Sequence, residues 1–335
     1  MPGPDQARSV AVPVTVVTGF LGAGKTTLVN RWLADFAPGE VAVIVNEHGT
    51  VGIDGELLAE RVRELVEING GCVCCVTQAE LVRALDALAT STKRPGRILI
   101  ETSGAASPAG VLRTIARGGR TGAFALDGVV TVVDASRLST LDEHELALEQ
   151  LGYADIVVLS RADACGADER ARALTEVTRR NGAAHVALSD RGDLVDVARP
   201  GERSLDALLD RRRGDFARTP RASDVDDRLA SPHVYESVSL VHEGDVDGER
   251  FADFVEAELA RSAGRLFRLK GILSVAGAPS RMIVQGVADL VEVTFGAPWN
   301  DAPRTSRLVV VGFGLEREAL SSAFRGCCVE RPPFL

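Results

Sequence analysis

The sequence predicts an α/β fold, in which a doubly wound, mostly parallel sheet is followed by a smaller C-terminal α+β domain. Two observations lead to this fold class. In the first half of the 335-residue chain, short apolar runs alternate with amphipathic helical segments, which is the pattern of βαβ units. Hydrophobic residues make up 45% of the chain but aromatic residues only 4%, and a core of aliphatic side chains suits parallel strands that are buried on both faces.

The first half of the chain begins with a strand that leads into a glycine-rich turn. Ligands of doubly wound sheets bind beyond the carboxyl ends of the strands, so the residues that follow each strand are the candidates for a site. Strands are predicted at 14–18, 41–45, 65–68, 97–100, 128–133 and 155–159, and helices at 28–36, 78–89 and 168–180.

The second half of the chain begins after a polar segment, 211–232, which is rich in Arg and Asp and which we interpret as a flexible linker. The elements beyond it predict a largely antiparallel sheet with helices. We therefore expect a disordered lead at 1–11, a nucleotide-binding domain at 12–210 and a C-terminal α+β domain at 233–335. Strands are predicted at 234–240, 266–275, 282–287, 290–295 and 307–312, and helices at 249–260 and 316–324.

Charge and hydropathy exclude several classes of protein. The formal net charge is −9, which argues against nucleic-acid binding and against a polybasic membrane anchor. No apolar run reaches the roughly 18 residues of a transmembrane helix, and the N-terminus has no hydrophobic signal core. The six cysteines are expected to be thiols rather than disulfides. These features favour a cytoplasmic protein without nucleic-acid or membrane partners.

A phosphate-binding motif follows the first predicted strand and opens the first helix. In G-x-x-x-x-G-K-T, backbone N–H groups cradle phosphates, Lys25 contacts the β and γ phosphates and Thr26 binds Mg²⁺. A glycine-rich turn with a chance lysine is the alternative, and the strand–turn–helix context argues against it. The nine positions define a P-loop NTPase domain and are Gly19, Phe20, Leu21, Gly22, Ala23, Gly24, Lys25, Thr26 and Thr27.

Two acidic residues each follow a predicted strand, Glu101 after 97–100 and Asp134 after 128–133. Glu101 is expected to bind Mg²⁺ or orient water, and Gly104 to bring a backbone N–H close to the γ-phosphate. A helix-capping cluster is the alternative for this segment. The sequence leaves open whether Asp134 belongs to the site or caps a helix.

The segment Ser160-Arg161-Ala162-Asp163 follows the strand at 155–159, where many GTPases read the base. The Asp163 carboxylate can accept two hydrogen bonds that guanine donates and adenine cannot. The aliphatic part of the Arg161 side chain is expected to stack over the base. Ser160 stands where those GTPases have an asparagine, and it cannot make all of that residue's hydrogen bonds. Guanine is therefore favoured over adenine.

Three cysteines with the spacing Cys-x-Cys-Cys precede the helix at 78–89. Cys72, Cys74 and Cys75 would offer Zn²⁺ three soft ligands and leave a fourth position open. Buried core cysteines and a redox dithiol are the alternatives. Glu47 and His48 lie in a segment placed like a nucleotide-sensing switch, and whether either completes the metal sphere is left open. We expect Cys165, Cys327 and Cys328 to be inert or to serve packing.

Together, these motifs resemble the CobW-like GTPases, a family grouped with the urease and hydrogenase maturation GTPases. The resemblance covers nearly the whole chain. It includes the segments 19–27, 46–54, 69–75, 101–104 and 132–134, and continues in 268–271, 284–287 and 307–312.

The resemblance implies a slow GTPase that binds GTP or GDP with Mg²⁺ and escorts a metal to a client metalloenzyme. Zinc is the expected metal, with cobalt or iron as alternatives, and a homodimer is left open. Lys25, Glu101 and Glu47 are assigned catalytic roles, and Thr26 and Glu101 hold Mg²⁺. Residues implied beside the nucleotide are the phosphate loop, Cys75, Val76, Thr77, Gln78, Gly104, Ser160, Arg161 and Asp163.

Three departures from the family pattern matter. His48 and Thr50 stand where the family commonly has Phe and Glu, the base motif begins with Ser160, and the linker has no histidine-rich tract. The resulting hypothesis is a metal carrier whose metal affinity is gated by the nucleotide. A regulatory NTPase, or a scaffold whose cysteines are structural or redox-active, is the alternative.

Overall fold

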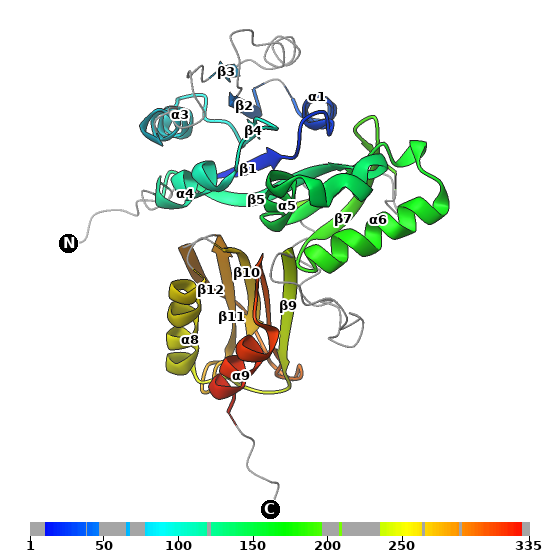
Figure 1. Cartoon of the computed structure of the whole chain (residues 1–335). Coiled ribbons are helices and arrows are strands. Elements are labelled where there is room, and N and C mark those ends of the chain that lie inside the picture. The colour runs from blue at the N-terminus through cyan, green and yellow to red at the C-terminus, as the bar shows by residue number, and fades with distance from the viewer. Residues whose placement is uncertain are drawn as a thin grey trace, which may run out of the picture.

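The computed structural model describes residues 11–37, 39–46, 65–67, 78–118, 122–195, 208–209, 235–262, 265–287 and 290–329. Within these residues the chain forms two sheets, each covered by helices (Figure 1). The larger sheet belongs to the N-terminal half and the smaller to the C-terminal half. None of the helices described is long and apolar enough to cross a membrane.

The N-terminal sheet has eight strands in the order β3-β2-β4-β1-β5-β6-β7-β8. All neighbours pair in parallel except β7 and β8, so the predicted parallel sheet is confirmed. The strands are β1 (Val12–Thr18), β2 (Val41–Asn46), β3 (Leu65–Glu67), β4 (Arg97–Thr102), β5 (Phe124–Asp134), β6 (Ile156–Ser160), β7 (His185–Asp190) and β8 (Asp193–Leu194).

Helices cover both faces of this sheet, which explains its continuous apolar strands. One buried cluster joins the sheet to α3, α4, α5 and α6, and another joins it to α1 through Leu28, Val29 and Trp32. The helices are α1 (Lys25–Leu33), α3 (Gln78–Thr90), α4 (Ala109–Gly118), α5 (Glu145–Gly152) and α6 (Ala167–Arg180), with 3₁₀ turns η2 (Ala135–Glu143) and η3 (Ala162–Ala164).

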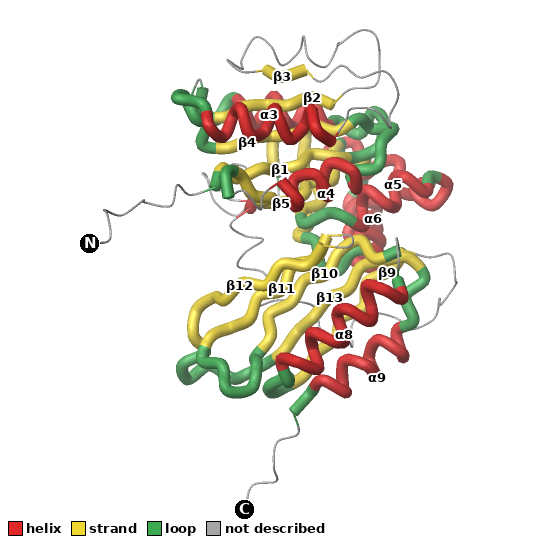
Figure 2. The backbone as a smooth tube through the Cα atoms, turned by 90° about the vertical axis from the view of Figure 1, so that its left-hand side faces the viewer, coloured by secondary structure: helices red, strands yellow, loops and turns green. Residues whose placement is uncertain are grey.

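The C-terminal sheet is antiparallel, with the order β12-β11-β10-β13-β9. The helices α8 (Gly248–Arg261) and α9 (Arg317–Cys327) lie on one face and bury the third apolar cluster (Figure 2). This is the predicted α+β domain. Its strands are β9 (Tyr235–His242), β10 (Leu266–Leu273), β11 (Ser280–Val287), β12 (Leu290–Pro298) and β13 (Ser306–Phe313).

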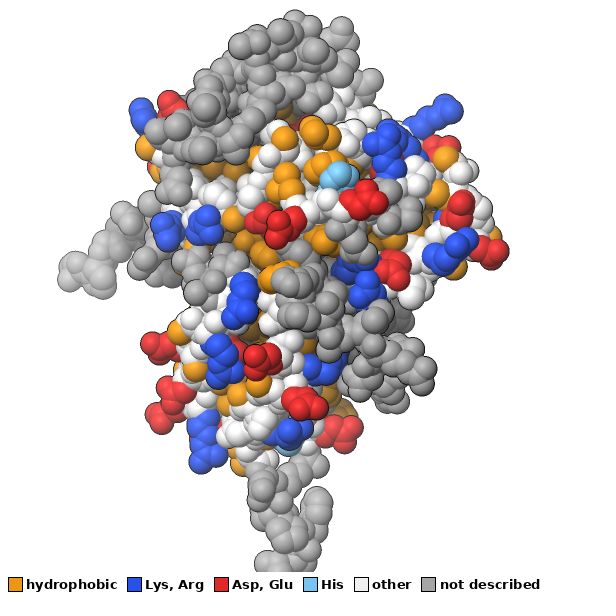
Figure 3. Space-filling view, viewed as in Figure 1, with side chains coloured by type: hydrophobic (Ala, Val, Ile, Leu, Met, Phe, Trp, Pro, Cys, Tyr) orange, Lys and Arg blue, Asp and Glu red, His pale blue; other side chains and the backbone are white. Residues whose placement is uncertain are grey.

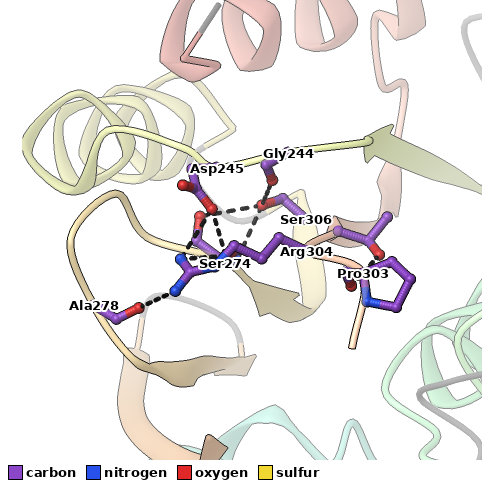
Figure 4. A network of polar contacts seen from close by, with 8 residues as sticks. Gly244, Asp245, Ser274, Ala278, Pro303, Arg304 and Ser306 are labelled. Atoms are coloured by element: carbon purple, nitrogen blue, oxygen red, sulfur yellow. Dashed lines mark hydrogen bonds and ion pairs between the residues drawn. The ribbon is translucent and has the colours of Figure 1, made fainter. Parts of the chain in front are cut away.

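A polar network ties together the loops at one end of this domain (Figure 4). Arg304 donates to Asp245 at 3.1 Å and to the carbonyl of Ala278 at 3.0 Å. Ser274 donates to the same carboxylate at 2.6 Å, and Ser306 donates to the carbonyl of Gly244 at 2.9 Å. These bonds hold the loops that follow β9 and β10 against the start of β13.

The two domains meet at the opposite end of β10. The Phe267 ring packs edge-on against Tyr153, with the ring centroids 5.1 Å apart. Asp155, which immediately precedes β6, pairs with Arg268 at 2.6 Å and with Lys270. Since Asp155 lies at the amino end of β6, the C-terminal domain contacts the end of that strand opposite the predicted site.

The predicted elements match the observed ones closely, although α4, α5, β7 and β8 were not predicted. The domain limits stay a prediction, because 196–207 and 210–234, which contain the predicted linker, lie outside the described residues.

Candidate functional site: a nucleotide pocket at the carboxyl ends of the strands

The phosphate loop occupies the turn between β1 and α1. Gly19 has φ = 141°, and a Cβ there would collide with the carbonyl oxygen of Val132 on β5. Glycine is therefore required where the loop crosses the neighbouring strand. Lys25 opens α1 directly after the loop, so the positive end of the helix faces the loop's interior.

The Lys25 side chain lies within the loop and is only 9% exposed. Its Nζ donates to the carbonyls of Gly19 at 2.9 Å and Phe20 at 3.3 Å. Gly104 lies against the same point, because a Cβ there would be 2.8 Å from the Leu21 nitrogen and 2.9 Å from Lys25 Nζ. The structure thus brings the predicted Lys25 and Gly104 together, with space only for a glycine.

Thr26 and Glu101 form an oxygen pair beside the lysine. Thr26 Oγ1 donates to Glu101 Oε1 at 2.7 Å, and Glu101 is 3% exposed. A hydroxyl and a carboxylate at the edge of a phosphate site are the hard ligands that Mg²⁺ prefers. The donor set therefore fits the predicted Mg²⁺ site.

A cavity of about 340 Å³ lies next to the loop, and Asp163, Ser160 and Arg161 line it together with Thr27 and Ser189. Ser160, which ends β6, and Arg161, which follows it, also hold the loop. Ser160 Oγ donates to the carbonyl of Ala23 at 2.6 Å, and Arg161 donates to that of Gly22 at 3.0 Å. The predicted base-reading residues thus lie together, and two of them brace the phosphate loop.

Asp134 has a capping role and supports the loop indirectly. Its carboxylate accepts from the Ser136 backbone N–H at 3.0 Å, which caps η2. It also pairs with Arg161, whose guanidinium reaches the phosphate loop. The structure therefore shows the capping role, and a direct role for Asp134 in the site stays a prediction.

Gln150 is a residue near the site that sequence reasoning missed. It is fully buried on α5, and its Nε2 donates to the carbonyls of Gly104 at 3.3 Å and Ala106 at 3.0 Å. It therefore holds the segment that follows β4. A glutamine more than forty positions from its partners carries no local sequence signal.

The remaining predicted site residues cannot be placed. Glu47, His48, Val76, Thr77 and the cysteines 72, 74 and 75 lie outside the described residues, and only the backbone of Gln78 is described, at the start of α3. Within the described ranges, no group of three or more His, Cys, Asp or Glu residues could hold a metal. Burial raises the pKa of the Cys165 and Cys327 thiols, in line with the inert role expected of them.

Comparisons with known proteins find similar sequences and a similar solved structure. Residues 13–187 match the model of the CobW/HypB/UreG nucleotide-binding domain, and residues 235–328 match the cobalamin synthesis protein CobW C-terminal domain. The zinc chaperone YjiA of Escherichia coli is 31% identical over 94% of this chain and 98% of its own length. The zinc chaperone CobW of Pseudomonas aeruginosa is 32% identical over 94% and 91%. The crystal structure of the Zn(II)-bound YjiA GTPase from E. coli aligns with a TM-score of 0.70 at 26% identity, covering 95% of this chain and 99% of that one.

Proposed function

The chain belongs to the CobW/HypB/UreG family of nucleotide-binding proteins, and from that membership we propose that it is a GTP-hydrolysing metallochaperone with zinc as its cargo. The observation that carries the nucleotide part of the proposal is the convergence of Lys25, Thr26, Glu101 and Gly104 at the ends of adjacent strands. The full-length similarity to proteins named zinc chaperones supports the choice of cargo.

Hydrolysis needs charge stabilisation on the phosphates more than it needs covalent chemistry. Lys25 and the loop N–H groups bind the β and γ phosphates, and the Gly104 N–H approaches the γ-phosphate. Thr26 and Glu101 would hold Mg²⁺, which supplies further positive charge beside the phosphates. Glu47 is proposed to orient the attacking water, on the basis of its position after β2 in the sequence.

Guanine is the proposed base because the Asp163 carboxylate lies on the wall of the cavity beside the loop. Arg161 extends along the same wall toward the loop and would cover one face of the base. The Ser160 hydroxyl already donates a hydrogen bond to the Ala23 carbonyl, so we assign base selection to Asp163 rather than to Ser160.

The cargo site is proposed at Cys72, Cys74 and Cys75, where the sequence offers three thiolates to Zn²⁺. The segment from Cys75 through Val76 and Thr77 leads into α3 at Gln78, and it is proposed to border the nucleotide. Nucleotide binding would then change metal affinity, and hydrolysis would release the metal to a client metalloenzyme. Cobalt and iron are the alternative cargoes, and we leave the choice between monomer and homodimer to experiment.

A metal titration tests the cargo site. The full-length protein should bind one Zn²⁺ tightly, Cys74→Ser should lose that binding, and Cys165→Ser should keep it. Equal zinc binding by the wild type and Cys74→Ser would instead support a regulatory NTPase with structural or redox cysteines. The same titration with Co²⁺ and Fe²⁺ ranks the cargoes.

A nucleotide titration tests the gating. Thermodynamic linkage requires that GTP and zinc change one another's affinity by the same factor. Equal GTP affinity for the apo and the zinc-loaded protein would contradict gating while leaving both binding sites intact. In a separate assay, Lys25→Ala should abolish phosphate release from GTP, and comparison of GTP with ATP measures base selection.

A further inference from the structure

The C-terminal sheet ends at β12, and no described strand pairs with the outer side of β12 (Figure 2). The register between β12 and β11 is regular from Leu290 to Phe295. Edge strands are usually protected by lysines, prolines or bulges, because their free N–H and C=O groups can pair with another chain. β12 contains one charged residue, Glu292, and its proline, Pro298, stands at the end. Its outer side can therefore accept a further strand.

An apolar groove of about 300 Å³ lies beside β12, between the sheet and α8. Val291 and Val293 of β12 line it, and Glu256 of α8 is its only charged lining residue among those described. Val293 is 47% exposed. Phe295, two residues further along and thus on the same face of the strand, is 68% exposed. Apolar side chains of an added strand would cover both residues.

Carboxylates flank this groove on both sides. Glu249, Asp253 and Glu256 are spaced four and three residues apart on α8, so they form one stripe along the helix. Figure 3 shows acidic side chains at the edge of the C-terminal domain where α8 lies in Figure 1. Glu292 is exposed on the other face of β12. None of these four carboxylates forms an ion pair with a described residue.

The cations of this domain do not neutralise the groove. Arg281 donates to main-chain carbonyls at the end of β12, and Arg261 pairs with a carboxylate of α8 at 2.8 Å. Arg250 lies one helical turn before Phe254, on the side of α8 that packs against α9. The two cations of β10 are buried against Asp155. The groove therefore combines an apolar floor with an acidic rim.

A second copy of this chain is a poor partner for such an edge. Two copies joined antiparallel through β12 would be related by a two-fold axis perpendicular to the sheet, so both α8 helices would lie on one face of the joined sheet. Their acidic stripes would then face each other across the groove, and like charges brought together disfavour association. The formal net charge of −9 on each copy adds to this repulsion.

We propose that β12 binds an extended segment of another protein, in which apolar residues alternate with lysine or arginine, and that this segment adds to the sheet as a further strand. Its main chain pairs with the outer side of β12, and its apolar side chains lie in the groove beside Val293 and Phe295. Its basic side chains lie on the opposite face, beside Glu292, and the carboxylates of α8 add a longer-range attraction. The proposal depends on neither the nucleotide nor the metal cargo.

A short peptide of alternating lysine and valine, with blocked ends, is the probe. Two control peptides match it: one has glutamate in place of every lysine, and the other has the same composition with the lysines and valines in separate blocks. Fluorescence anisotropy with the full-length protein should show that the alternating lysine peptide binds about tenfold more tightly than either control. Its affinity should fall as salt is added.

Hydrogen-exchange mass spectrometry tests the strand pairing itself. The amides of 290–298 should exchange more slowly with the lysine peptide bound, because the added strand accepts hydrogen bonds from β12. The amides of β9, at the other edge of the same sheet, should be unchanged.

Two variants with matched controls identify the groove. Val293→Asn removes an apolar contact without adding charge and should weaken peptide binding about fivefold. Val241→Asn is its control, because Val241 is 46% exposed on β9. Glu292→Lys reverses the charge beside the added strand and should also weaken binding about fivefold. Glu318→Lys, at an exposed position of α9, makes the same change in net charge and should have no effect. Thermal unfolding verifies that each variant is folded.

Several results would overturn the proposal. Failure of the lysine peptide to bind, or equal affinity for the alternating and block peptides, would exclude an added strand. Equal affinity for the lysine and glutamate peptides would exclude charge recognition. Protection of the 290–298 amides without any peptide would show that a segment of this chain covers β12. A dimer that Val293→Asn dissociates would assign the edge to a second copy.

Discussion

Asp155→Asn should strongly destabilise the contact between the two domains. The Asp155 carboxylate is fully buried and accepts hydrogen bonds from the Val129 backbone N–H at 2.8 Å and from Arg268 at 2.6 Å. Lys270 pairs with the same carboxylate, and both cationic side chains are almost completely buried. In either orientation of the amide, its N–H₂ group would face a donor, either the Val129 N–H or the two buried cations, and the charge that faces those cations would be lost.

The expected loss follows from that burial. Removing one partner of a buried ion pair typically costs about 3–5 kcal/mol, because the opposite charge stays desolvated. Asp193→Asn is the matched control, since Asp193 pairs with Arg31 at 2.5 Å but the two side chains are 50% and 36% exposed. An exposed pair of this kind contributes about 0.2–1 kcal/mol.

The two tryptophans allow each domain to be followed separately. Trp32 is buried in the N-terminal domain and Trp299 in the C-terminal domain. Urea unfolding of Trp32→Phe and Trp299→Phe backgrounds reports on one domain at a time. In Asp155→Asn we expect a lower urea midpoint of unfolding. We also expect the transition reported by Trp32 to differ in midpoint from the transition reported by Trp299. A loss no larger than that of Asp193→Asn would refute the reasoning from burial.

Three further predictions concern the pocket and the buried groups. Gly104→Ala should weaken GTP binding far more than GDP binding, because its Cβ would lie 2.9 Å from Lys25 Nζ, and titration with both nucleotides measures this. Burial raises the pKa of Glu258, although Arg261 opposes the rise. The carboxylate therefore lowers stability above its unfolded pKa, so Glu258→Gln should raise the unfolding midpoint at neutral pH, with a gain that vanishes below pH ~4.3. The buried thiols of Cys165 and Cys327, with raised pKa values, should be alkylated by iodoacetamide only on unfolding, as mass spectrometry of digests would show.

The phosphate loop was predictable because its information is local. Nine consecutive residues, set between a strand and a helix, specify the turn at Gly19 and the position of Lys25. The fold class followed from the same kind of signal, since buried parallel strands are continuous apolar runs. Local patterns of this kind need no knowledge of the rest of the chain.

The missed elements had weaker local signals. α4 begins directly after Pro108 and contains Gly110, which obscured the helical spacing of Val111, Leu112 and Ile115. α5 has eight residues, and β7 is a short strand whose side chains are mostly half-buried. Such segments gain their structure from the sheet they pack on, and propensity alone does not reveal them.

Contacts between distant segments could not be read from the sequence at all. Gln150 reaches Gly104, and Arg161 reaches both Asp134 and Gly22, only because the strands that precede them belong to one sheet and end at the same edge. The three clustered cysteines remain a prediction from spacing, since they lie outside the described residues.

Glu101 and Asp134 show how register decides what an acid at a strand end does. Both lie at the carboxyl ends of strands that flank β1, and the sequence offers similar roles for each. Glu101 pairs with Val17, so its side chain comes level with the start of the phosphate loop and accepts from Thr26. Asp134 lies three residues beyond Thr131, the partner of Thr18, and so extends past the loop's first turn. It therefore meets Arg161 from the neighbouring strand, and it supports the loop through that side chain rather than beside the phosphates.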